Sequence, residues 1–144
     1  NKEDLYEAVL ERIVEKLITL VDKQTLTAEP VTLSVWVTTL LNDVWDYLAA
    51  DNGLYLQVVR NWSQLDFVSG MDVLEQKMLS VLSVYLLQQP TRISPNTGDL
   101  PAQLYILTNS ILFTLLRYIS KPSPLVSRQS LIAEFARMVE RSLL

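Results

Sequence analysis

From Leu100 to Leu116 the chain carries no Asp, Glu, Lys or Arg, and this run limits the folds that the sequence can adopt. Asp99 and Pro101 are residues typical of a helix start. The run is shorter than the ~20 apolar residues that a membrane-spanning helix needs, and it contains polar side chains such as Asn109. A helix that is apolar on most sides must be covered on most sides. We therefore expect a helix from Leu100 to about residue 120, buried among other helices of the protein.

Helical periodicity extends over most of the remaining chain. Only 3 of the 144 residues are glycine, which argues against a turn-rich β fold. Polar or proline-containing breaks separate segments whose apolar residues recur at helical spacing. The segments that we expect to be helical are 1–23, 30–50, 54–65, 67–89, 100–120 and 127–144. The sequence therefore predicts an all-α fold of about six helices in an antiparallel bundle, forming one domain over residues 1–144.

Single residues mark the ends of several expected helices. Pro30 suits the first turn of the second helix, and Ser127 suits the cap of the last one. The segment 88–101 holds three prolines and one glycine, and it is either a surface connector or a loop beside a pocket. The first helix carries an apolar stripe at Leu5, Val9, Ile13, Leu17 and Leu20.

The residue types that are missing exclude several functions. The chain has 0 Cys and 0 His, so it has no disulfide, no thiolate or Ser-His nucleophile and no histidine metal ligand. Its net charge of −4 provides no basic face for nucleic acid. The charged, acidic start is unlike a signal peptide. We expect a cytoplasmic protein that is not an enzyme, binds no metal or cofactor and makes no contact with DNA through this chain.

Both ends of the chain resemble a known family. Residues 1–5, Asn-Lys-Glu-Asp-Leu, together with Val9, resemble the start of the first helix after the DNA-binding head in TetR-family transcriptional regulators. Residues 127–144, SRQSLIAEFARMVERSLL, resemble the last helix of that family. The number and order of expected helices are similar along the whole chain, whereas only the two ends are similar in sequence. The resemblance implies a regulatory domain whose helix-turn-helix head would precede Asn1 and is missing from this chain.

The resemblance also implies partners and a mechanism. It implies a bacterial repressor that binds operator DNA through the missing head and senses a small-molecule effector that enters among the middle helices and shifts the first helix. It implies a homodimer in which the last two helices pair with those of a second subunit as a four-helix bundle. The residues that we expect at this interface are Leu104, Leu107, Ile111, Leu115, Tyr118, Ile132, Phe135, Val139 and Leu143.

Aromatic and methionine side chains in the middle helices are candidates for the effector pocket. Such a lining would suit a largely apolar ligand, although for each single aromatic side chain a place in an ordinary core is the commoner explanation. The candidate ligand-binding residues are Trp36, Trp45, Tyr55, Trp62, Phe67, Met71, Met78, Tyr85, Tyr105, Asn109 and Phe113.

Two polar sites interrupt the apolar helices, Asn109 in the fifth and Asn42-Asp43 in the second. Buried polar groups need partners. For Asn109 the partner is a ligand, another group of the same chain, or its counterpart across a dimer axis. The alternative function is a helical dimerisation or scaffold domain without a ligand. An internal cavity would favour the sensor, and a solidly packed core would favour the scaffold.

Overall fold

The computed structural model describes residues 2–26, 32–50, 72–73, 75–81 and 99–143, and it is helical throughout its regular parts. The named helices are α1 (Lys2–Leu26), α2 (Leu33–Leu48), α5 (Leu100–Ser120) and α6 (Arg128–Leu143). Residues 72–73 and 75–81, inside the fourth expected helix, are helical as well. No strand occurs in these ranges, so the expectation of an all-α fold is confirmed. The third expected helix lies outside the described residues.

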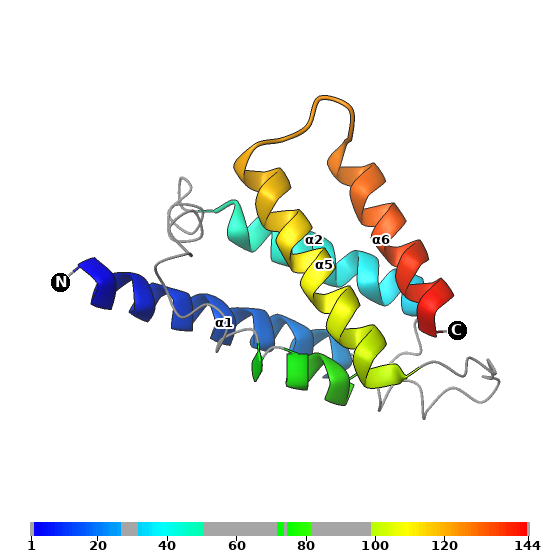
Figure 1. Cartoon of the computed structure of the whole chain (residues 1–144), viewed down its shortest axis with the longest axis horizontal. Coiled ribbons are helices and arrows are strands. Elements are labelled where there is room, and N and C mark those ends of the chain that lie inside the picture. Colours follow the sequence, from blue (N-terminus) through cyan, green and yellow to red (C-terminus); the bar gives the residue numbers. More distant parts are fainter. Residues whose placement is uncertain (1, 27–31, 51–71, 74, 82–98, 144) are drawn as a thin grey trace.

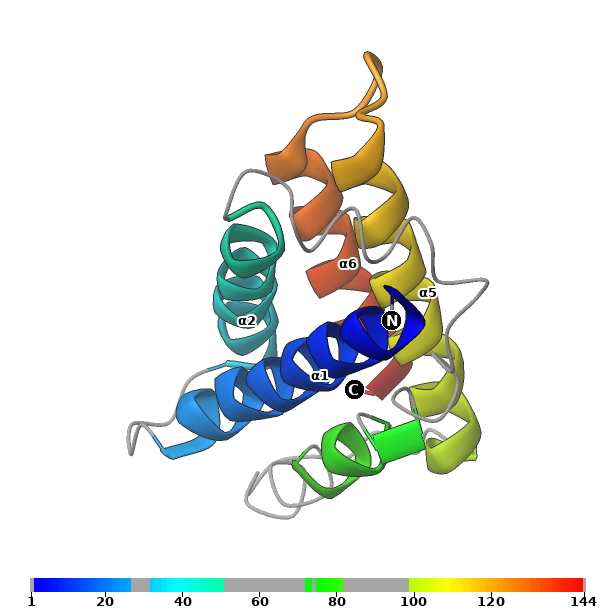
Figure 2. The same ribbon diagram turned by 90° about the vertical axis from the view of Figure 1, so that its left-hand side faces the viewer.

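The described helices pack around one shared core. α5 and α6 run antiparallel, joined by residues 121–127, and α2 packs most extensively against α6 (Figure 1). α1 lies across one side of this group, in contact with α2 (Figure 2). The helical residues 75–81 lie close to the end of α1 and the first half of α5 (Figure 1). Each of these helices therefore contributes one face to the shared core.

The apolar stripe of α1 enters this core only from its second turn onward. Ile13, Leu17 and Leu20 are buried and Val9 packs at the edge, whereas Leu5 remains 61% exposed. The fully buried side chains with the largest volume are Leu33 and Leu48 on α2 and Leu115 on α5. Burial of such leucines supplies most of the free energy that holds helices of this length together.

The helix starts follow local capping rules. Asp99 accepts a hydrogen bond from the backbone N–H of Ala102 at 3.3 Å, and Ser127 Oγ accepts one from Ser130 N–H at 3.1 Å. Both expected caps are thereby confirmed. α2 begins later than Pro30 suggested, because Thr32 caps it by accepting a hydrogen bond from Val35 N–H at 3.3 Å.

An arginine at the start of α6 joins that helix to α2. Arg128 Nη2 donates to Asp46 Oδ1 at 2.8 Å and to Asn42 Oδ1 at 3.0 Å, and its guanidinium carbon lies 5.0 Å from the centre of the Trp45 ring. Trp45 also packs edge-on against Tyr118 of α5, with 5.2 Å between ring centres. Asn42, one of the polar interruptions of the second helix, is thus satisfied within the chain.

Candidate functional site

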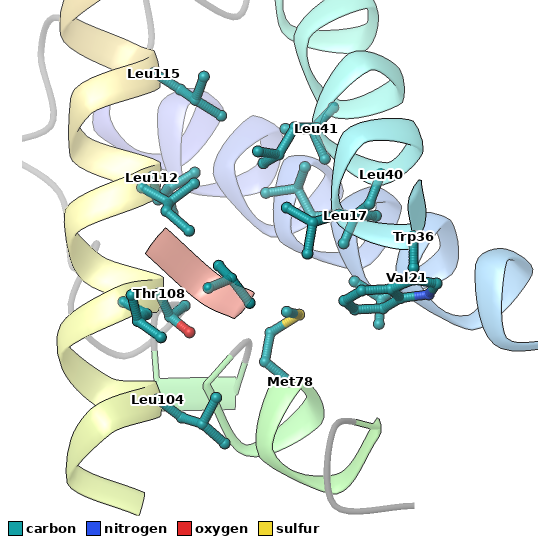
Figure 3. Close-up of a pocket in the computed structure, with 15 residues that line it drawn as sticks. Leu17, Val21, Trp36, Leu40, Leu41, Met78, Leu104, Thr108, Leu112 and Leu115 are labelled. Carbon is teal, nitrogen blue, oxygen red and sulfur yellow. The ribbon is translucent and has the colours of Figure 1, made fainter. Parts of the chain in front are cut away.

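An apolar cavity of about 90 Å³, open on one side, lies between α1, α2 and α5 (Figure 3). One residue of α6 and one from the helical residues 75–81 complete the described part of its wall. The described lining consists of Leu17, Val21, Trp36, Val37, Leu40, Leu41, Val44, Met78, Leu104, Leu107, Thr108, Ile111, Leu112, Leu115 and Val139.

The spacing of the lining residues explains why they meet. On α5 the lining positions are 104, 107, 108, 111, 112 and 115, which form one continuous helical face. On α2 they are 36, 37, 40, 41 and 44, and on α1 Leu17 and Val21 are one turn apart. The inner face of the uncharged helix therefore forms the largest part of the wall.

The chemistry of the described lining is almost wholly apolar. Apart from the indole N–H of Trp36, Thr108 provides its only polar side-chain group, and no charged group belongs to it. A cavity of this kind provides no general acid, base or nucleophile in its described wall, but it can enclose a small apolar molecule. Its volume is below that of the dry cavity of about 150 Å³ that accommodates benzene. A single ring is therefore the upper limit of what fits, and its entry requires some adjustment of the wall.

Polar contacts hold the wall residue Met78 in place from two sides. Lys77 Nζ lies 2.5 Å from Asp22 Oδ1 of α1. Glu75, three residues before Met78, accepts a hydrogen bond through Oε1 from Asn109 Nδ2 of α5 at 2.6 Å. These two contacts attach the helical residues 75–81 to both α1 and α5. Because both pairs are partly exposed, their role is to fix position rather than to add much stability.

The structure places the predicted ligand-binding residues in different environments. Trp36 and Met78 line the cavity. Trp45 is buried, but it packs against Tyr118 and Arg128 instead. Tyr105 and Phe113 lie on the outer side of α5 and are exposed. Tyr55, Trp62, Phe67, Met71 and Tyr85 lie outside the described residues.

Asn109 has partners within its own chain. Its amide nitrogen donates to Glu75 and, at 2.8 Å, to the backbone carbonyl oxygen of Tyr105. The structure therefore pairs Asn109 with groups of its own chain, which was one of the three possibilities considered. Asn109 does not line the cavity.

The residues expected at a dimer interface are covered by their own chain. Leu104, Leu107 and Leu115 are buried on the inner face of α5, and Ile111 and Tyr118 pack against the same core. On α6, Ile132, Phe135 and Val139 are buried in the core as well. The side chain of Leu143 lies outside the described part of the structure. In this conformation a second subunit would meet other side chains of α5 and α6.

The aliphatic residues of the cavity wall were not among the sequence-based candidates for ligand binding, and five of them were expected at the dimer interface instead: Leu104, Leu107, Ile111, Leu115 and Val139. Leu40, Leu41 and Leu112 carry no chemical mark that separates a pocket residue from a core residue, because both are buried leucines. The sequence position of Thr108 was the feature that could have indicated this wall. Thr108 falls in register with Leu104, Leu112 and Leu115 on the uncharged helix, so one polar group occurs on an apolar face.

A second hollow of about 430 Å³ lies at the end of α5 and in the following loop. Its lining includes Thr114, Arg117, Lys121 and Ser123. Arg117 and Lys121 flank the carboxyl end of α5, where cations complement the helix dipole without any ligand. The helix end therefore accounts for these two charges.

In the described part of the chain, no group of three or more Asp or Glu residues could hold a metal ion. Among those same residues, no helix is long and apolar enough to cross a membrane. Comparisons of the chain with protein-family models, with curated proteins and with solved structures find no match. The resemblance of the two chain ends to the TetR family therefore remains an expectation from sequence.

Proposed function

We propose that this chain is the effector-sensing and homodimerising domain of a transcriptional regulator of the TetR type. In this proposal a small, largely apolar ligand occupies the cavity between α1, α2 and α5, and its binding changes the affinity of the regulator for operator DNA. The observation that carries the proposal is the apolar cavity, one wall of which is formed by Leu17 and Val21 of α1. A solidly packed core would have favoured a scaffold.

The position of α1 gives the ligand a route to control DNA binding. In the proposed regulator the DNA-binding head is attached to the start of α1, and the chain itself is acidic, with a net charge of −4. A ligand that contacts Leu17 and Val21 favours the position of α1 that fits around it. Because a ligand shifts an equilibrium only by its difference in affinity for the two states, this contact is the required source of coupling.

We predict that benzene, used as a probe, stabilises the chain and slows amide exchange in α1. At ten times its dissociation constant, a ligand that binds only the folded state adds about 1.4 kcal/mol to the free energy of unfolding. Thermal unfolding should therefore shift upward, and exchange near Leu17 and Val21 should slow up to about tenfold. The measurements are a thermal melt and hydrogen exchange followed by mass spectrometry. An unchanged melting temperature at millimolar benzene would count against a ligand cavity. If benzene slows amide exchange elsewhere but not in α1, the sensing role of α1 would be contradicted.

The proposed homodimer involves the outer face of α5. Tyr105 and Ile106 there are 60% and 63% exposed, and Phe113 and the α6 residue Met138 are also large, exposed apolar side chains. Exposed apolar residues on an uncharged helix are typical of surfaces that another protein covers. The interface would then use α5 and α6, as expected, but the outward positions between the buried ones.

We predict that light scattering during gel filtration gives a mass near twice 16.4 kDa at low micromolar concentration. Ile106→Glu should reduce it to the monomer mass, because an unpaired carboxylate in an apolar interface is strongly unfavourable. Leu125→Glu is the matched control, since Leu125 is 92% exposed in the loop before α6. A monomer for the unmodified chain, or a dimer that survives Ile106→Glu, would rule out this interface.

A further inference from the structure

The polar side chain in the cavity wall, Thr108, is surrounded by apolar residues. Leu104, Leu107, Ile111 and Leu112 are its neighbours on the same face of α5, and all of them line the cavity. Figure 3 shows the Thr108 oxygen on the side of α5 that is turned toward Met78. The hydroxyl is therefore placed where a molecule in the cavity would contact it.

The Thr108 hydroxyl has no hydrogen-bond partner among the described residues, in contrast to threonines of other helices. Thr19 donates to the carbonyl oxygen of Glu15 at 2.9 Å, and Thr38 donates to that of Ser34 at 2.8 Å. Such a bond to the preceding turn is the usual way for a helical threonine to satisfy its hydroxyl. Thr108 is partly buried and makes no bond of this kind. The hydroxyl presents a small polar surface to the cavity.

Water that reaches this hydroxyl through the open side of the cavity gains few further hydrogen bonds from the described wall. A buried water molecule typically needs two to four polar partners, and cavities lined by aliphatic side chains stay dry. The Trp36 nitrogen is turned away from Thr108 (Figure 3), and the other described lining residues are apolar, so a water beside Thr108 would find one side-chain partner in the described wall. The group that satisfies Thr108 at lowest cost is therefore an oxygen carried by a molecule that is otherwise apolar.

We infer that the ligand of this cavity is a small, uncharged molecule of about one ring that carries a single hydroxyl or carbonyl oxygen, and that this oxygen hydrogen-bonds to Thr108. This inference rests on the proposed function, which supplies the premise that the cavity binds a ligand. A charged ligand is disfavoured, because the described lining offers no opposite charge to replace the lost hydration. Met78 can adjust its flexible side chain to slightly different ring sizes.

The test compares phenol with benzene, which share a ring and differ in one hydroxyl. Both are titrated against the unmodified chain, Thr108→Val, Thr108→Ser and Thr114→Val, with binding followed by ligand-observed NMR. Thr108→Val keeps the shape and removes the hydroxyl, and Thr108→Ser keeps the hydroxyl. Thr114→Val is the matched control, because Thr114 is exposed on the same helix and does not line the cavity.

We expect Thr108→Val to weaken phenol binding about tenfold, since an unpaired polar group in an apolar site costs that much or more. Benzene binding should stay within about twofold, because an isosteric apolar replacement removes no contact that benzene uses. Thr108→Ser should bind phenol better than Thr108→Val does, and Thr114→Val should behave as the unmodified chain.

The outcomes separate this inference from the proposed function. If Thr108→Val binds phenol and benzene in the original ratio, the hydrogen bond to Thr108 is excluded while the cavity remains a ligand site. If neither probe binds the unmodified chain, the ligand cavity itself is excluded and the inference falls with it. A circular dichroism spectrum and a thermal melt of each variant show that the fold is intact before the ratio is interpreted.

Discussion

Leu115→Ala is expected to lower the free energy of unfolding by about 3 kcal/mol, because leucine-to-alanine changes in well-packed cores cost about 2–5 kcal/mol. Leu115 is 1% exposed and lies in the cavity wall, so its truncation adds to a space that is already empty. The loss would be a large fraction of the total stability of a domain, which is typically about 5–15 kcal/mol. Urea unfolding measures it directly.

The same variant should gain affinity for benzene. The enlarged cavity admits a ring with less strain, and a bound ligand restores contacts that the truncation removed. We expect benzene to raise the melting temperature of Leu115→Ala by more than it raises that of the unmodified chain. The variant tests stability and ligand binding at one position.

Leu48→Ala is the matched control for this effect. Leu48 is as fully buried as Leu115, but it lies on α2 outside the described cavity lining. Its truncation should cost a similar free energy without increasing the benzene-dependent shift. If both variants respond equally to benzene, the probe is filling new holes wherever they arise, and the natural cavity has no special affinity.

The sequence predicted where helices begin and end better than it predicted which side of each helix is buried. Asp99 and Ser127 cap their helices as expected, because a capping side chain acts on the backbone two or three residues away and needs no tertiary information. The start of α2 was misplaced by a similar local ambiguity, since Pro30 and Thr32 are both acceptable helix starts. Local chemistry therefore accounts for both the success and the error.

The inner and outer faces of α5 were not separable from sequence. Leu107 and Ile106 are neighbours of nearly the same polarity, yet one is buried in the core and the other is 63% exposed. The run from Leu100 to Leu116 carries no charged residue and so shows no solvent-facing side in its pattern, and the helices that it meets decide the direction in which it packs. For this reason the residues expected to face a partner are buried in their own chain.

Only two of the described residues in the cavity wall were among the sequence-based candidates for ligand binding. An apolar site among the middle helices was expected, and Trp36 and Met78 were among its candidates. Trp45 was also a candidate, but it packs edge-on against Tyr118 and under the guanidinium of Arg128. A tryptophan at a junction of helices and a tryptophan in a pocket wall look alike in a sequence, because both are large, buried and apolar.

Val37→Phe is expected to abolish detectable binding of benzene and phenol. Val37 is buried and lines the cavity from α2, so the added phenyl group occupies the space that a ligand would use. Overpacking a full core costs about 1–3 kcal/mol, but here part of the ring enters a space that is empty. We therefore expect the free energy of unfolding to fall by less than about 1 kcal/mol, while the dissociation constants rise at least a hundredfold, equivalent to about 2.7 kcal/mol.

Val35→Phe provides the comparison that makes this result interpretable. Val35 lies two residues earlier on the same helix, is 52% exposed and does not line the cavity. It receives the same substitution with the same change in helix propensity, so it should bind both probes as the unmodified chain does. Equal loss of binding in the two variants would place the probes somewhere other than the cavity. Retained binding in Val37→Phe, with an intact fold, would do the same. Because Val37 and Thr108 face the cavity from different helices, phenol in the cavity should respond to substitution at both positions and benzene to Val37→Phe alone, whereas a ligand on the surface should respond to neither.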